Sequence, residues 1–153
     1  MSHIESKRAQ HDALRWRIAQ GAQHLYYSDQ WQVLEERNSA SAAYATHQYV
    51  WSPVYVDAMV LRDRDANASN DGVLEERLYV THDANFNVTA LVDTGGVVQE
   101  RFIYDPYGTR SVLDANWAPD ANGLSDYTFR HGHQGGRHDL HAGLRRRRLS
   151  GSC

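Results

Sequence analysis

The sequence predicts an all-β fold built as an antiparallel β-hairpin meander. Nine Tyr, four Trp and three Phe stand among 153 residues, and aromatic side chains pack well on the pleated surface of a sheet. Between residues 78 and 113, apolar-rich runs of strand length alternate with clusters of turn-forming residues. A turn with an Asp followed by an alternating apolar run also recurs along the chain. These observations together predict an array of repeated hairpins.

The expected strands follow from the apolar runs, and the expected turns from the polar clusters between them. Upstream, a loop at 63–72 is expected to join strands at 53–62 and 73–81. Downstream, the strands are expected at 78–82, 88–92, 97–104 and 109–113.

Each downstream turn has its own chemistry. The cluster at 83–87 supplies Asx side chains that can accept hydrogen bonds from the backbone ahead of them. The cluster at 93–96 supplies glycines for positive φ. The stretch at 105–108 reads Asp-Pro-Tyr-Gly and places Pro at the second and Gly at the fourth position of a type I turn.

The same pattern is found in four stretches: HDALRWRI at 11–18, YSDQWQVLEER at 27–37, HDANFNVTAL at 82–91 and YDPYGTRSVL at 104–113. Their leading aspartates are Asp12, Asp29, Asp83 and Asp105. The longest interval contains a further aromatic-Pro turn at 51–53, which leaves spacings of about 20 to 30 residues, as in a repeat array.

The stretch YDPYGTR at 104–110 resembles the unit of the Rhs/YD-repeat family, a Tyr-Asp dipeptide followed by a Gly-containing turn and a strand. Segments at 25–37, 48–65 and 77–93 are similar to those just upstream of the core-associated region in that family, and HQGGRHD at 133–139 resembles the stretch that follows. The resemblance covers roughly residues 11–139.

The resemblance implies a segment of a spiralling β-sheet shell, which in full-length relatives encloses a C-terminal toxin or other cargo. It also implies an extracellular or cell-envelope location, and other YD repeats of a longer parent chain as partners. Residues 1–139 would form the repeat segment. After Asp139 the chain reads LHAGLRRRRLSGSC in place of the family's Tyr-rich signature, so residues 140–153 are expected to form a disordered or truncated basic tail.

The chain departs from the repeat pattern at several positions. His11 and His82 stand where the repeat has Tyr, and Arg15 stands where it has Gly.

Charge and hydropathy narrow the classes of function. The net charge is −3, divided into +4 for residues 131–153 and −7 for the remainder. The block at 145–148 holds four arginines without interleaved aromatics, which argues against sequence-specific nucleic-acid binding. No run approaches the roughly 18 apolar residues of a membrane span, and the polar N-terminal stretch does not resemble a signal peptide.

Asp105-Pro106-Tyr107-Gly108 superficially resembles the family's self-cleavage motif. It is followed, however, by Thr109-Arg110 and another strand, as a repeat turn would be. No second carboxylate is visible that would form an acid/base pair with Asp105. The sequence therefore predicts a structural turn here and no catalytic residue or cofactor.

Two metal sites are candidates. From residue 63 onward, side chains with oxygen atoms stand at alternate positions, as at the start of an EF-hand calcium loop. However, Ala68 stands where such a loop needs Gly, and Leu74 stands where it needs Glu. The calcium candidates are Asp63, Asp65, Asn67 and Asp71. The second candidate is a His-rich stretch that could bind nickel or zinc adventitiously, consisting of His131, His133, His138 and His141.

The leading functional hypothesis is a non-catalytic structural segment. In it, sheet edges could mediate self-association, and seven aromatic side chains pack along the strands: Tyr26, Tyr49, Trp51, Tyr55, Tyr79, Phe102 and Tyr104. The alternative is a secreted or cell-surface module that binds carbohydrate or a protein partner through Trp31, Trp51, Trp117 and Tyr107. A weaker alternative is a metal-dependent hydrolase that uses the His131–His141 cluster.

Overall fold

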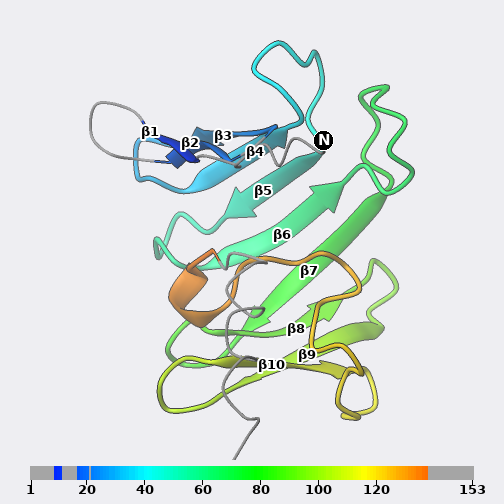
Figure 1. Cartoon of the computed structure of the whole chain (residues 1–153). Coiled ribbons are helices and arrows are strands. Elements are labelled where there is room, and N and C mark those ends of the chain that lie inside the picture. Colours follow the sequence, from blue (N-terminus) through cyan, green and yellow to red (C-terminus); the bar gives the residue numbers. More distant parts are fainter. Residues whose placement is uncertain (1–8, 12–16, 21, 138–153) are drawn as a thin grey trace, which may run out of the picture. The chain divides into compact units, whose positions relative to one another are not determined.

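The chain is all-β, and its strands form an antiparallel meander (Figure 1). The computed structural model describes residues 9–11, 17–20 and 22–137. In these residues the strands are β1 (Ala9–His11), β2 (Arg17–Gln20), β3 (Gln23–Tyr27), β4 (Val33–Arg37), β5 (His47–Trp51), β6 (Met59–Arg64), β7 (Glu76–His82), β8 (Val88–Val92), β9 (Val98–Tyr104) and β10 (Arg110–Asp114). A 3-10 turn, η1, spans His133–Gly135. The strands neighbour one another in sequence order.

The chain divides into two compact units, Met1–Tyr79 and Val80–Cys153, which are described separately below as the N-terminal and C-terminal units. The boundary falls inside β7. Among the described residues, no helix has the length and apolar character needed to cross a membrane.

The downstream strands agree with prediction to within about two residues, because each is bounded by a strong turn. The predicted strand at 53–62 begins too early, since only residues 59–62 of this range belong to a strand. β5 ends at Trp51, and β6 begins only at Met59. Between them, Ser52 N–H donates to the Ala58 carbonyl at 2.7 Å, and the Ser52 hydroxyl accepts from Val54 N–H at 3.2 Å. This loop contains Pro53, which has no N–H to donate to a strand ladder.

The buried face of the N-terminal unit is a cross-strand row. Tyr49 on β5 pairs with Arg62 on β6, and Arg62 pairs with Leu78 on β7. All three are buried. The Tyr49 hydroxyl donates to the buried Glu36 carboxylate at 2.9 Å, and Arg62 forms an ion pair with Glu76. The polar side chains in this core are thus bound to one another, because a buried charge without a partner would be unfavourable.

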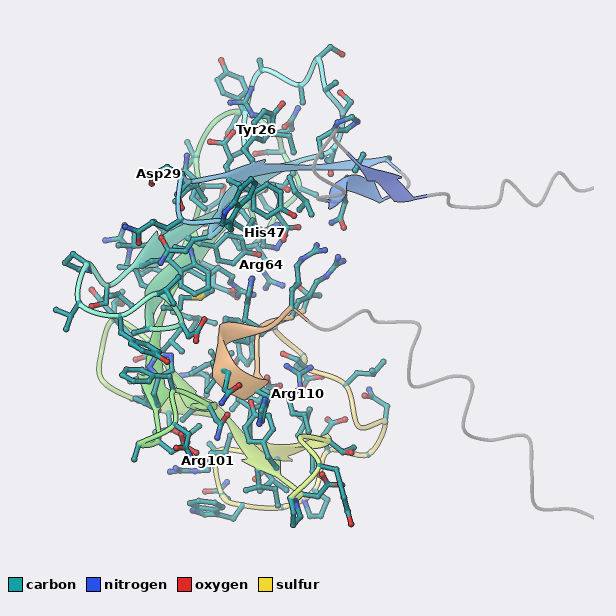
Figure 2. The ribbon with its side chains drawn as sticks, turned by 90° about the vertical axis from the view of Figure 1, so that its left-hand side faces the viewer. Tyr26, Asp29, His47, Arg64, Arg101 and Arg110 are labelled. Carbon is teal, nitrogen blue, oxygen red and sulfur yellow. The ribbon has the colours of Figure 1, made fainter. Side chains whose placement is uncertain are left out.

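The other face of the sheet is largely exposed and carries apolar side chains, among them Val50 and Tyr79, as well as polar ones. Arg77 on β7 donates two hydrogen bonds to Asp63 on β6, at 2.8 and 2.7 Å. The Arg37 guanidinium lies 5.0 Å from the centre of the Tyr26 ring. Figure 2 shows Tyr26 on β3. It also shows His47 beside Arg64, its cross-strand partner, and these two lie on the same face as Tyr49 and Arg62.

The C-terminal unit consists of the end of β7, strands β8 to β10, and a returning segment at 115–137. Phe129 of this segment is fully buried and stacks on Phe102 of β9, with ring centres 5.9 Å apart. Its backbone also covers the outer edge of β10, where Leu113 bridges to Pro119 and Asp120 N–H donates to the Val112 carbonyl at 3.0 Å. The segment therefore supplies part of the core and covers a strand edge.

The predicted set of packed aromatics is correct only in part. Tyr49 and Phe102 are buried. Tyr26, Tyr55 and Tyr79 are 39%, 43% and 39% exposed, and so they do not form the core. Aromatic composition favoured strands without showing which face each ring would take, since a shift of one residue moves a side chain to the opposite face.

Candidate functional site

One hairpin turn recurs in the C-terminal unit, and it is the structural form of the predicted Asp repeat. In each copy the N–H of the leading Asp donates to the carbonyl four residues on, and its carbonyl accepts from the N–H three residues on. The carboxylate Oδ1 accepts from the backbone N–H two and four residues on, and the residue at the fourth position has positive φ. Complete copies begin at Asp83, Asp93, Asp105 and Asp114.

Asp105 is engaged in this turn. Its Oδ1 accepts from Tyr107 N–H and Thr109 N–H, each at 2.8 Å, and Gly108 at the fourth position has φ +79°. A left-handed backbone of this kind suits glycine. A side chain at position 108 would also meet the His133 ring at 3.2 Å. The predicted structural turn is confirmed at Asp105.

The leading residue of the turn after β3 was predicted wrongly. Ser28 occupies the first position, since its hydroxyl accepts from Gln30 N–H and Gln32 N–H, each at 3.2 Å. Asp29 is the second residue of the turn and is exposed (Figure 2). A Ser hydroxyl and an Asp carboxylate can make the same contacts, so searching for Asp alone moved the register by one residue. Asp12 lies outside the described residues.

The turn at Asp114, whose fourth position carries Trp117, was not predicted from the sequence. Trp117 has φ +71°, and Phe86 and Trp31 occupy the corresponding position with φ +59° and +66°. A bulky residue in this region is uncommon.

Replacing Asp105 by alanine should lower the free energy of unfolding of the C-terminal unit by about 1–2 kcal/mol, because two backbone N–H groups lose their acceptor. Asp105→Asn retains an oxygen at the same place and should restore most of this loss. Tyr107→Ala alters the same turn at a side chain that is 94% exposed and should change little. Urea denaturation of the three variants measures the difference, and equal stabilities for D105A and the wild type would contradict a structural role.

A buried carboxylate connects β9 to the returning segment. Glu100 is 3% exposed. It accepts a hydrogen bond from the Ser125 hydroxyl at 2.5 Å and another from Asp126 N–H at 2.9 Å. Burial raises the pKa of Glu100, against the effect of these two donors and of the positive charge on Arg110. Sequence reasoning missed this group because nothing local marks Glu100 as buried.

The raised pKa of Glu100 gives the stability of the C-terminal unit a pH dependence of known sign. The native state binds this proton more tightly than the unfolded state, so the contribution is complete at low pH and is lost as pH rises through the native pKa. We expect Glu100→Gln to lose less stability than the wild type when urea denaturation is compared between about pH 4 and pH 7. The exposed Glu75→Gln is the matched control, and an identical pH profile for E100Q and the wild type would contradict the assignment.

The calcium candidates lie in and beside the loop between β6 and β7, and their oxygens are used within the chain. Asp63 binds Arg77. The two carboxylate oxygens of Asp65 accept from the N–H groups of Ser69 and Asn70, at 3.2 and 2.9 Å. Asp71 Oδ1 accepts from Val73 N–H at 2.9 Å, and this bond holds the pKa of Asp71 below its usual value.

The histidine candidates do not come together in the described residues. His131 is buried and lies edge-on to Phe129, with ring centres 6.0 Å apart. His133 is exposed and lies edge-on to Tyr104 at 6.2 Å. His138 and His141 lie outside the described residues. Within the part of the chain that the structure describes, no group of three or more His, Cys, Asp or Glu side chains could hold a metal ion.

The predicted ligand-binding aromatics differ in exposure. Tyr107, Trp117 and Trp31 are 94%, 60% and 44% exposed, whereas Trp51 is partly covered and donates its indole N–H to the Val33 carbonyl at 2.8 Å. The Arg101 guanidinium lies 4.5 Å from the centre of the Trp117 ring, and Arg101 Nε donates to the Ala115 carbonyl at 3.1 Å. The Trp117 ring is therefore exposed, and one side of it contacts the Arg101 guanidinium, which is itself held by a hydrogen bond to the backbone.

No protein-family model and no curated protein matches the sequence.

Proposed function

We propose that the chain is a non-catalytic structural segment of an Rhs/YD-repeat protein, a stretch of β-sheet wall that in full-length relatives encloses a C-terminal toxin or cargo. The observation that supports this most directly is the recurring turn. In four hairpins, one oxygen of the leading Asp accepts hydrogen bonds from two backbone N–H groups, and Asp105 is one of these four.

The arrangement of strands agrees with this proposal. The described strands pair antiparallel, and they neighbour one another in sequence order. Such a sheet grows by adding hairpins, so its natural partners are further YD repeats of a longer parent chain, which the resemblance places in the extracellular space or cell envelope. The covered edge of β10 makes further pairing on that side unfavourable, because Pro119 lies there and lacks an N–H.

Concentration-dependent self-association tests the wall proposal. An array segment should pair through its remaining strand edges, so light scattering should show a rising mean mass between about 1 and 100 µM, a range in which aggregation-prone edges act. Hydrogen exchange at the two concentrations should show added protection in the outer N-terminal strands and none in β9. A monomer across this range, with unchanged exchange, would count against the proposal.

The second candidate function is binding of a carbohydrate, and the exposed ring of Trp117 beside Arg101 favours it. An aromatic ring that is open on one face can stack against the apolar face of a sugar. The carboxylates of Asp114 and Asp120 lie in the same loop region and disfavour phosphorylated ligands.

A glycan array with matched variants tests this second function. Trp117→Gly removes the ring and relieves the positive φ, whereas Phe86→Gly relieves the same backbone strain at the equivalent position of another turn. Carbohydrate binding should be lost in W117G and retained in F86G. Absence of saccharide-dependent binding by the wild-type chain would exclude this function.

A further inference from the structure

Two Asn-x-Ser/Thr sequences occur in the chain, and in the fold the Asn of one is exposed whereas the Asn of the other is buried. One is Asn67-Ala68-Ser69, in the loop between β6 and β7, and the other is Asn87-Val88-Thr89, at the start of β8. This sequence is the acceptor for N-linked glycosylation, which requires an accessible Asn amide and the hydroxyl two residues on. The burial of each Asn and the hydrogen bonds of its amide show which of the two is accessible to a glycosyltransferase.

The first sequence is exposed. Asn67, Ala68 and Ser69 are all exposed, and the Asn67 side-chain carbonyl accepts from Ser69 N–H at 2.7 Å. This Asx turn folds the chain so that residue 69 comes back toward the Asn67 amide. The Asn67 amide nitrogen donates to Glu75 Oε1 at 2.6 Å in an exposed contact, which a transferase can replace without unfolding the loop.

The Asn side chain of the second sequence is buried and engaged in hydrogen bonds. Asn87 is 8% exposed, and its amide nitrogen donates to Asp83 Oδ2 at 2.7 Å. Its carbonyl accepts from Gln134 N–H at 3.1 Å. Val88 is fully buried, and the Thr89 hydroxyl lies 2.9 Å from that of Thr81. A glycan on Asn87 would displace the returning segment at Gln134.

We infer that Asn67 is an acceptor site for N-linked glycosylation that the folded chain presents, and that Asn87 is not. The donor is a sugar activated at its anomeric carbon by a diphosphate. The new bond joins Asn67 Nδ2 to C1 of the sugar, and the bond from C1 to the diphosphate oxygen breaks. One proton leaves Nδ2 for the enzyme's base, and the diphosphate departs with the bonding electrons. This inference does not depend on the wall function.

The test uses the full-length chain with a soluble asparagine glucosyltransferase and uridine diphosphate glucose, followed by peptide mapping by mass spectrometry. The folded chain should gain one hexose, located at Asn67, while Asn87 remains unmodified. The urea-unfolded chain, diluted into the same reaction, should be modified at both positions. Ser69→Ala should abolish the modification at Asn67, and Ser69→Thr should restore it. The neighbouring Asn70, which lacks a hydroxyl residue two positions on, is the internal control.

Each alternative result overturns the inference. Modification of Asn87 in the folded chain would show that burial does not select the site. Failure to modify Asn67 in the folded chain, whether or not the unfolded chain is modified there, would show that the loop does not present it. Modification that survives Ser69→Ala would show that this acceptor sequence is not what the enzyme recognises.

Discussion

Replacing Phe129 by alanine is expected to lower the free energy of unfolding of the C-terminal unit by about 3–5 kcal/mol. Phe129 is fully buried, stacks on Phe102 and lies edge-on to His131. The truncation would leave a cavity between β9 and the returning segment. Because domains are stable by only about 5–15 kcal/mol, a substantial part of the total would be lost. Urea denaturation followed by near-ultraviolet circular dichroism measures this loss.

The control for this prediction is Leu124→Ala in the same returning segment. Leu124 is 48% exposed, and its truncation should change the stability by less than about 0.5 kcal/mol. If F129A and L124A are equally stable, the returning segment does not contribute to the core. Increased hydrogen exchange in β9 of F129A, with none in L124A, would place the effect at the Phe102 contact.

The returning segment marks the limit of what the sequence predicted. The strands from β7 to β10 could be placed because their turns carry Asp, Asn and Gly at fixed offsets, and this chemistry acts over four or five residues. The burial of Phe129 and Glu100 depends on contacts between positions 25 or more residues apart. No local pattern encodes such contacts. No individual strand or turn between residues 115 and 132 was therefore predicted from the sequence, although this part of the chain completes the core.

The turns show a similar limit on a smaller scale. At Asp105 the Gly at the fourth position indicates a left-handed residue, and the whole turn could be predicted from the sequence. At Asp114 and Ser28 the fourth position holds Trp117 and Trp31, both with positive φ. Propensity disfavours these residues there, so the hydrogen bonds of the leading side chain must outweigh the backbone strain. The recurring element is the leading oxygen, and the Gly is one of several ways to complete the turn.

Replacing Arg110 by methionine is expected to cost about 2–4 kcal/mol, the second large effect. The Arg110 guanidinium donates to the backbone carbonyls of Phe129 and His131, at 3.0 and 3.3 Å, and lies 4.9 Å from the centre of the Phe102 ring. Methionine keeps the apolar stem and loses the charge. Both carbonyls would lose this donor, and Glu100 would lose the positive charge that opposes the rise in its pKa.

A double-mutant cycle with Glu100→Gln separates the loss of the two hydrogen bonds from the loss of charge compensation. If the Arg110 charge matters to Glu100, R110M should cost less in the E100Q background than in the wild type, and the difference is the coupling between the two groups. The difference should shrink at low pH, where Glu100 of the wild type is protonated and position 100 is therefore neutral in both backgrounds. Arg77→Met, which removes an exposed ion pair with Asp63, should have little effect under the same conditions. Equal costs of R110M in both backgrounds would mean that Arg110 acts only by holding the returning segment, since its link to Glu100 would then contribute nothing measurable.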